Sequence, residues 1–327
     1  MPIRVAVPLN LPPEAGRPPI GSRVRLGGPT MGVAWTATAV APPHLLGGRL
    51  RDAVQGAVDQ VVAEMSQWES ESALSRFNRA PPGWVAAPPG LLAVVAAGVE
   101  VARASGGAFD PTLGALVDLW GFGPAGAGAA PEAGALADAA IGWELIELDL
   151  QGGRIRQPGG LRLDLAGIAK GYGVDRAGAA LAALGVPSWL VEIGGELRGA
   201  GVKPNGEPWF VEVERAPGSA DAELLRVAAY GLAVASSGDW RRVLRRNGRS
   251  ISHTIDPVTR EPLRNDLSGV TVLHAECMYA DAWCTALMTL GLARGQELAE
   301  REGLATMFQP ADGTPPMFSS ALQAMLE

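Results

Sequence analysis

The chain has 327 residues, of which 47% are hydrophobic and 19% charged, a composition typical of globular proteins and not of disordered or fibrous ones. Its formal net charge of −7 argues against a general nucleic-acid or anionic-membrane binder. Two cysteines and three histidines leave little for a disulfide framework or a zinc site, and no run of about 18 apolar residues suggests a membrane span.

The N-terminal segment MPIRVAVPLNLPPEAGRPPIGS has prolines scattered where a signal peptide needs an apolar stretch, and it has no lipidation cysteine. We therefore expect residues 1–27 to form a flexible Pro-rich arm and residues 28–327 to form a single domain. The same segment predicts no membrane anchor and a cytoplasmic location.

In the first half of the chain, weak alternation predicts a strand over residues 31–40. Apolar residues at helical spacing predict helices over residues 49–68 and 90–107. The Gly- and Ala-rich stretch 121–134 reads as a connector, and a short helix is expected over residues 135–141.

The second half combines further strands and helices. Strands are expected within residues 143–150, 154–157, 161–165, 189–195, 209–214, 225–238, 268–274 and 305–309. Helices are expected over residues 172–185, from Tyr279 onwards and over residues 292–303, and Asn247-Gly248 predicts a hairpin over residues 240–257. Helices and β-meanders come in blocks, which indicates an α+β fold and not a doubly wound sheet.

Two glycine patterns and one arginine cluster invite functional readings. Gly121 to Gly126 match G-x-G-x-x-G, but a helix-like segment precedes them, so we do not interpret them as a dinucleotide fingerprint. The stretch 166–175, AGIAKGYGVD, either offers backbone N–H groups to an anion at a helix start, or connects a strand to a helix with Lys170 in solvent. Arginines flank the predicted hairpin turn, and a solvated face explains them more simply than nucleic-acid binding.

The stretch ADAWCTALMTL carries a carboxylate in an otherwise apolar helix. Asp281 and Thr285 lie four residues apart and share one helix face, with Cβ atoms about 5–6 Å apart. Hard oxygen donors in that arrangement suit Mg²⁺. The alternative is that Asp281 caps or complements the start of its own helix while Thr285 has no role. On the same helix, Cys277 and Cys284 would be about 10.5 Å apart, too far to form a disulfide.

His253 lies in SISHTIDP, at the end of the second hairpin strand. An imidazole takes a proton near neutral pH, and Asp256 is close enough in sequence to orient it. The residue is therefore a candidate general base, although a structural role is the alternative.

Taken together, eight segments resemble the ApbE family of FAD:protein FMN transferases, in the family's order and over about residues 28–310. They are TMGVAW (30–35), MSQWESESALSRFN (65–78), GGAFDPTLGALVDLWGFG (106–123), LDLAGIAKGYGVD (163–175), WLVEIGGELRGAG (189–201), ASSGDW (235–240), SHTIDPVTREP (252–262) and ADAWCTALMTLG (280–291).

The resemblance implies a compact, ApbE-like (T-fold-like) architecture with largely antiparallel sheets and packed helices. It also implies Mg²⁺-dependent (or Mn²⁺-dependent) transfer of FMN from FAD to a Thr or Ser hydroxyl, with release of AMP. The acceptor would be a flavoprotein with a D-x-x-[ST]-[GA]-A-T motif, in the cytoplasm if the location above is right. Two alternatives stay open: a metal-dependent FAD pyrophosphatase that gives FMN and AMP, and a FAD-binding module without chemistry.

Carried over by position, the resemblance implies that Asp281, Thr285 and the backbone carbonyl of Ala169 hold the metal and that His253 is the base. It implies flavin-nucleotide contacts from Met31, Trp68, Ala108, Phe109, Asp110, Ala166, Tyr172, Ile255 and Cys284.

Four positions depart from the family pattern. Trp68 stands where Tyr is common, and Ser236 where Thr is common; both changes are mild. Ala73 replaces a Glu, and Arg260 replaces the Gly of D-P-x-T-G. We expect the last two changes to affect ring contacts or docking of the protein substrate.

Overall fold

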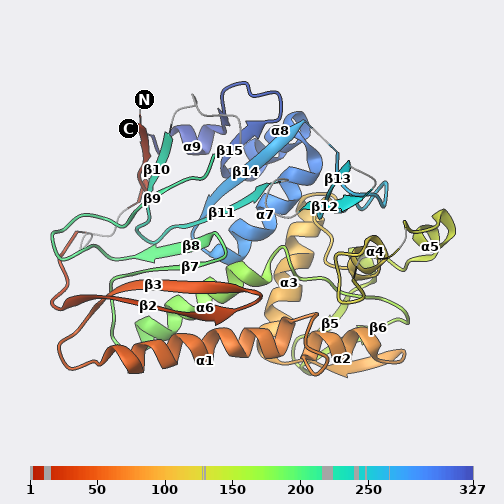
Figure 1. The fold of residues 1–327 in the computed structure, drawn as a ribbon, viewed down its shortest axis with the longest axis horizontal. Helices are drawn as coiled ribbons and strands as arrows, with labels where there is room; N and C mark the ends of the chain where they lie inside the picture. The colour runs from red at the N-terminus through yellow and green to blue at the C-terminus, as the bar shows by residue number, and fades with distance from the viewer. Residues whose placement is uncertain are drawn as a thin grey trace.

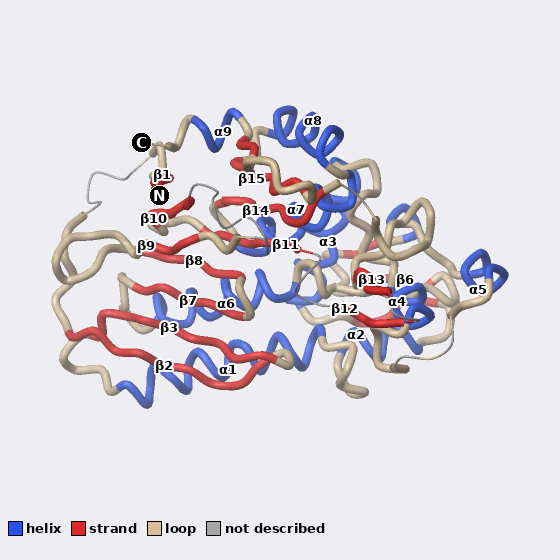
Figure 2. The backbone as a smooth tube through the Cα atoms, turned by 45° about the horizontal axis from the view of Figure 1, so that its top comes forward, coloured by secondary structure: helices blue, strands red, loops and turns tan. Residues whose placement is uncertain are grey.

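The computed structural model describes residues 3–10, 16–126, 128, 130–215, 224–238, 243–246, 249–264 and 266–326, with the backbone alone for 243–246 and 249–250. An eight-stranded sheet runs across the described part of the chain, where its neighbouring strands pair antiparallel (Figure 2). In sheet order its strands are β16 (Met317–Phe318), β15 (Ala305–Pro310), β14 (Leu267–His274), β11 (Ala233–Gly238), β8 (Glu196–Ala200), β7 (Trp189–Ile193), β3 (Val33–Ala41) and β2 (Ser22–Thr30).

Helices cover this sheet, as Figure 1 shows. Helix α6 (Ala169–Ala183) packs on β7 and β8, and α7 (Cys277–Leu290) packs on β11 and β14. Helix α1 (Gly47–Met65) lies against α6 and β2, while α3 (Pro89–Ala104) and α8 (Leu292–Glu302) lie against α7. Most of α7 is buried because it has neighbours on several sides, which explains why its sequence is apolar nearly all round.

The remaining described elements form smaller units around this core. A second sheet has the order β1 (Ile3–Ala6), β10 (Leu224–Ala228), β9 (Phe210–Glu212), and a third has β4 (Gly83–Ala86), β6 (Arg154–Gln157), β5 (Glu147–Asp149). Strands β12 (Val243–Arg246) and β13 (Arg249–Ser252) pair as a two-stranded sheet. Short helices are α2 (Ala73–Arg79), α4 (Gly114–Trp120), α5 (Ala133–Asp138), α9 (Ser320–Gln323) and the 3₁₀ turn at Trp143–Leu145.

This architecture confirms the α+β expectation, but it differs from the expected N-terminal arm. Strand β1 pairs in parallel with β10, and the fully buried Ala6 bridges Leu326, so the two chain ends lie side by side (Figure 1). The expected domain boundary at residue 28 falls inside β2. Pro29 is tolerated within β2 because this strand lies at the edge of its sheet and needs no second ladder.

Three local predictions of strands differ from the structure. Residues 161–165 form no strand: Arg162 makes an isolated bridge with Leu113, and the Asn78 amide bonds the N–H and the carbonyl of Leu163 at 2.8 and 2.9 Å. The single strand expected over residues 225–238 is two strands, β10 and β11, separated by Gly231 at φ 65°. The 3₁₀ turn at Trp143–Leu145 shortens the strand expected over 143–150 to β5.

Other expectations from the sequence are confirmed. Gly121 ends α4 in the left-handed conformation, so the G-x-G-x-x-G match follows a helix and not a strand. Both cysteines are buried on α7 and unpaired. Strands β12 and β13 pair antiparallel, as the hairpin prediction requires, whereas Asn247, Gly248 and the flanking arginine side chains lie outside the described part of the chain. Among the described residues no helix has the length and apolarity needed to cross a bilayer.

Candidate active site

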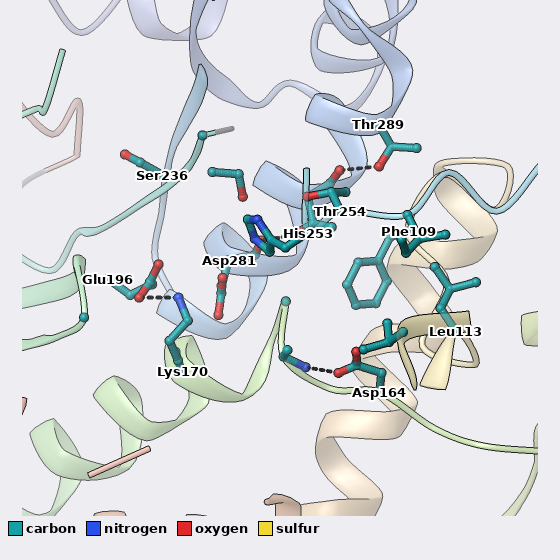
Figure 3. Close-up of a pocket in the computed structure, with 18 of the residues that line it drawn as sticks. Phe109, Leu113, Asp164, Lys170, Glu196, Ser236, His253, Thr254, Asp281 and Thr289 are labelled. Carbon is teal, nitrogen blue, oxygen red and sulfur yellow. Dashed lines mark hydrogen bonds and ion pairs between the residues drawn. The ribbon is translucent and has the colours of Figure 1, made fainter. Parts of the chain in front are cut away.

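A cleft of about 310 Å³ opens where the first turn of α6 faces α7. Its walls come from segments far apart in the sequence: the turn before α6, the ends of β8 and β11, the residues after β13, and residues 108–117 (Figure 3). A second, more apolar cavity of about 110 Å³ adjoins it, because Met31, Asp164, Ala166 and Lys170 line both.

Helix α7 presents one polar stripe to the cleft. Asp281, Thr285 and Thr289 follow each other at intervals of four residues, and all three line the cavity. The Asp281 side chain is only 4% exposed. The hydroxyl of Thr289 donates to the Thr285 carbonyl at 2.9 Å, which fixes its rotamer along the helix. The helical spacing therefore places Asp281 and Thr285 on one face, as the sequence predicted, and adds Thr289, which the same spacing would have identified.

Asp281 caps the neighbouring helix and not its own. Its Oδ2 accepts a hydrogen bond from the backbone N–H of Gly171, in the first turn of α6, at 3.0 Å. In return, Asp175 of α6 accepts from the N–H groups of Cys277 and Met278 at 3.1 and 2.9 Å, at the start of α7. Neither helix has a side-chain cap from its own N-cap residue. The alternative reading, in which Asp281 serves the start of its own helix, is therefore wrong.

The turn before α6 approaches α7 very closely. A Cβ at Gly167 would lie 2.8 Å from the Thr285 hydroxyl oxygen, so a larger residue there would displace that hydroxyl. Thr285 therefore faces Gly167 and Asp281 faces Gly171, so both side chains face the segment 167–171. Ala169 is the first residue of α6 and lines the smaller cavity. Its carbonyl as a third metal ligand stays a prediction.

Lys170 is held in an ion pair. Its Nζ lies 2.6 Å from a carboxylate oxygen of Glu196, a β8 residue that is 1% exposed (Figure 3). The Lys170 side chain is 32% exposed, so it is partly solvated as the alternative expected, but the buried carboxylate gives it a fixed partner. The lining of the larger cavity contains the carboxylates of Asp110, Asp164, Glu196 and Asp281, with Lys170 as its lysine. An anionic ligand in this cleft would meet an excess of negative charge.

His253 projects into the same cleft as Asp281 (Figure 3). It follows β13 directly, and Ile255 behind it is buried against Leu116 and Val117 of α4. The Oδ1 of Asp256 accepts from the N–H groups of Val258 and Thr259 at 2.8 and 3.3 Å. Asp256 therefore builds the turn after the histidine, a role that the sequence did not reveal.

Most of the residues expected at the flavin nucleotide line these cavities. The larger cavity is lined by Met31, Ala108, Phe109, Asp110, Ala166 and Ile255, and the smaller one by Trp68, which is 57% exposed. Asp110 accepts hydrogen bonds from the backbone and the hydroxyl of Thr112 at 2.8 and 2.6 Å. Burial of this carboxyl raises its pKa above 3.8 despite those bonds.

Cys284 and Tyr172 lie outside both linings. Cys284 immediately precedes Thr285, which turns it by about 100° around the helix away from that residue. It faces the sheet and donates to the carbonyl of Ala235 in β11 at 3.0 Å. Burial raises the pKa of its thiol. Tyr172 packs against the core, and a Cβ added at Gly90 would contact both its hydroxyl and the Glu64 carboxylate. Direct flavin contacts from these two residues stay a prediction.

Sequence reasoning missed several polar residues of the cleft: Asp164, Glu196, Ser236, Ser237 and Thr289. The first two lie within expected motifs, LDLAGIAKG and EIGGEL, but no local periodicity links Glu196 to Lys170. Only the antiparallel turn between β7 and β8 brings that carboxylate to α6.

Comparisons with known proteins agree on one family. A profile of the ApbE family matches residues 31–308. The FAD:protein FMN transferase of Vibrio cholerae is 33% identical over 311 residues, which cover 93% of each chain. That of Salmonella typhimurium is 31% identical over 296 residues, which cover 88% of this chain and 84% of the relative.

Solved structures agree as well. The apo flavinyl transferase ApbE of Pseudomonas stutzeri superposes with a TM-score of 0.85 at 36% identity, covering 93% of this chain and 96% of that one. The ApbE protein of Thermotoga maritima shares the fold, with a TM-score of 0.83 at 24% identity. The fold and the sequence, matched over nearly the whole chain to proteins named flavin transferases, define an enzyme of the flavin transferase class. The chain belongs to the ApbE family.

Proposed function

We propose that this protein transfers FMN from FAD to a Thr or Ser hydroxyl of an acceptor flavoprotein, in a Mg²⁺-dependent reaction that releases AMP. The observation that carries the proposal is the meeting of Asp281 and Thr285 with the first turn of α6 in one cleft. The names of the related proteins, FAD:protein FMN transferases, support the same reaction.

The donor set of the cleft fits Mg²⁺, with Mn²⁺ as the other candidate. Asp281 offers a carboxylate, Thr285 a hydroxyl and the Ala169 turn a carbonyl, all of them hard oxygen ligands. Among the described residues no group of three or more His, Cys, Asp or Glu is placed to hold a metal by itself. A metal bound here would therefore complete its coordination with phosphate oxygens of the substrate, as Mg²⁺ commonly does.

The charges of the cleft give a reason for a cation. A diphosphate entering a site lined by four carboxylates and Lys170 would be repelled unless more positive charge accompanied it. A bound divalent cation neutralises charge that develops on the bridging and leaving oxygens. Lys170 and the backbone N–H groups at the start of α6 would add fixed positive potential on the same side.

His253 is the proposed base. A Thr hydroxyl is a weak nucleophile at neutral pH, and a positioned base typically contributes about 10²–10⁴-fold. In the proposed step the hydroxyl oxygen bonds to the phosphorus on the FMN side of the diphosphate while its proton passes to the His253 imidazole. The bond from that phosphorus to the bridging oxygen breaks, and AMP leaves with that oxygen. The product is a phosphodiester between FMN and the acceptor side chain.

The apolar part of the site suits a flat ring. Met31, Phe109 and Ile255 line the larger cavity, while Trp68 and Met31 line the smaller one. Aromatic and thioether side chains pack well on planar ring systems. We therefore assign the flavin-nucleotide contacts to these residues together with Ala108, Asp110 and Ala166.

The test is an incubation of the purified protein with FAD, Mg²⁺ and an acceptor protein that carries a D-x-x-T-G-A-T segment. We expect a fluorescent acceptor band that survives denaturation, a mass increase equal to FMN phosphoester formation, and one AMP per modified acceptor. A Thr→Ala change within the acceptor segment is the matched control and should give no band.

Two outcomes would contradict the proposal. FAD binding without product, with or without Mg²⁺, would indicate a binding module. Release of FMN and AMP at the same rate with the acceptor and with its Thr→Ala control would indicate a pyrophosphatase that uses water. Chelation of divalent metal should stop the transfer, and restored activity on adding Mg²⁺ or Mn²⁺ identifies the ion.

A further inference from the structure

Arg260 has a backbone conformation that few residues with a side chain adopt. Its φ is +61°, in the left-handed region, and Met31 is the other described non-glycine residue with positive φ. The strain of such a conformation is on the order of 1 kcal/mol or more, and it persists only where the surroundings enforce it. Two hydrogen bonds of the Arg260 backbone hold this conformation. Its N–H donates to the Asp256 carbonyl at 2.8 Å, and its carbonyl accepts from the Trp120 side chain at Nε1 at 2.9 Å.

The guanidinium of Arg260 binds the end of another helix. Its Nη1 donates to the carbonyls of Leu136, Ala137 and Ala139 at 2.5, 3.0 and 3.1 Å. These carbonyls lie in the last turn and at the C-cap of α5, where helix carbonyls lack partners within the helix. A cation is favoured there by the helix dipole as well. Helix α5 has no buried residue of its own, so this contact is a main attachment of α5 to the molecule.

The contact between the Arg260 guanidinium and the end of α5, here called the clamp, lies next to residues that form one wall of the cleft. Ile255 is buried in a small cluster with Leu116 and Val117 of α4. Leu136 of α5 and its C-cap residue Ala139 pack against the same cluster. Val117 and Ile255 also line the cleft beside His253. The segment that carries His253 packs on α4 through Ile255, and α5 follows α4 along the chain. Arg260 belongs to the same segment as His253 and binds the end of α5. The segment is therefore in contact with both helices.

We propose that Arg260 is a positioning residue that holds the His253–Ile255 wall against α4 and α5 and thereby aims His253 at the reacting hydroxyl. This inference rests on the function proposed above, in which His253 is the base. Arg260 itself does not line the cleft, so it acts through the segment it holds.

The decisive variant is Arg260→Gly. Glycine adopts a φ of +61° without strain, so this change removes the guanidinium while it relieves the backbone, and a loss of activity cannot be assigned to a strained turn. We expect kcat for flavin transfer to fall about 10- to 100-fold, the scale of a small misplacement of a catalytic group, with the KM for FAD changed less than about twofold. Arg260→Lys keeps a cationic donor and should recover part of kcat.

Arg301→Ala is the matched control. Arg301 makes the same kind of contact, from its Nη2 to the carbonyl of Ala104 at the end of α3 at 2.6 Å, but it does not line the cleft. Its kcat should equal that of the unmodified protein. A kcat of Arg260→Gly that also equals it would overturn the proposal.

A double-variant cycle with His253→Ala separates positioning from a general effect. If Arg260 acts through His253, adding Arg260→Gly to His253→Ala should cost less than about twofold more, because coupled residues are not additive. If Arg260→Gly lowered kcat by the same factor in the His253→Ala protein as in the unmodified protein, the proposal would be overturned.

Amide hydrogen exchange gives a readout that needs no activity. In Arg260→Gly, exchange should accelerate over residues 133–139 and 253–257 and stay unchanged in α3. Unchanged exchange over residues 253–257 would overturn the clamp. If the unmodified protein transferred no flavin at all, the proposed function would fail, whereas accelerated exchange over these residues would still support the clamp itself.

Discussion

Asp281 on α7 accepts a hydrogen bond from the N–H of Gly171 on α6 at 3.0 Å, and this bond joins the cleft-facing side of one helix to the first turn of the other. Asp175 on α6 forms an ion pair with Arg198 at 2.7 Å. It also accepts hydrogen bonds from two backbone N–H groups in the first turn of α7. Each helix is thus capped by a carboxylate of the other. The separation between the start of α6 and the stripe Asp281–Thr285 is fixed by hydrogen bonds as well as by packing.

Two substitutions at Asp281 separate its cap from its proposed role at the metal. In Asp281→Asn the side-chain oxygen still accepts from Gly171, whereas Asp281→Ala removes cap and charge together. We expect Asp281→Ala to lower the free energy of unfolding by about 1–2 kcal/mol, and Asp281→Asn to stay within about 1 kcal/mol of the unmodified protein. Both should lose Mg²⁺-dependent transfer. Urea unfolding of the apoprotein and a Mg²⁺ titration of activity measure the two effects, and Mg²⁺-dependent activity in Asp281→Asn would contradict the ligand role.

Gly171 tests how closely α6 and α7 are packed. A Cβ at this position would lie 2.2 Å from the carbonyl oxygen of Cys277, a backbone atom that cannot move without shifting α7. We expect Gly171→Ala to lower the free energy of unfolding by about 3 kcal/mol. Gly56→Ala is the control, since Gly56 is exposed in α1 with no heavy atom within 4 Å of the added Cβ. It should stabilise the protein by up to about 1 kcal/mol. A mild effect at Gly171 would mean that the two helices are free to separate.

His253→Ala should lower the rate of flavin transfer about 10²–10⁴-fold and leave FAD affinity nearly unchanged, because a base contributes to the transition state more than to binding. Stopped-flow or steady-state assays give the rate, and an equilibrium titration with FAD gives the affinity. His274→Ala is the comparison, since His274 ends β14 and bonds the backbone of Glu276, away from the cleft lining. Equal loss of FAD binding in His253→Ala and Asp281→Ala would mean that the roles of base and metal ligand are wrongly divided.

Local periodicity was sufficient for much of the fold and for the polar stripe of α7 that lines the cleft. The 3.6-residue repeat predicted α1 and α3, and the helix expected from Tyr279 onwards places Asp281 and Thr285 on one face, as α7 does. The same repeat predicts Thr289. It also explains Cys284, which lies about 100° around the helix from Thr285 and bonds the carbonyl of Ala235 in β11. The family resemblance implied that Cys284 contacts the flavin nucleotide. Its position around the helix axis instead places it outside both cavity linings.

Non-local pairing explains what the sequence could not reveal. Strand β1 lies in a Pro-rich segment, and its partner β10 lies more than 200 residues later in the chain. No local sequence pattern therefore distinguishes β1 from a flexible arm. Glu196 reaches Lys170 only through the β7–β8 turn, and Arg260 reaches α5 across more than 120 residues. Such contacts depend on strand register and helix packing, which hydrophobic patterns leave open.

Asp110 gives a prediction about pH. Burial raises the pKa of its carboxyl above 3.8, so the folded protein binds this proton more tightly than the unfolded chain does. Its contribution to stability is therefore full below pH 3.8 and is lost as the pH rises through the raised folded pKa. Asp110→Asn removes the charge but keeps an oxygen that accepts from Thr112. We expect the apoprotein variant to melt at a higher temperature than the unmodified protein at pH 7, and the difference to shrink as the pH falls towards 4. Thermal unfolding followed by circular dichroism at both pH values measures it, and a variant that is less stable at pH 7 would show that the Asp110 carboxylate is stabilised in the fold by more than its bonds to Thr112.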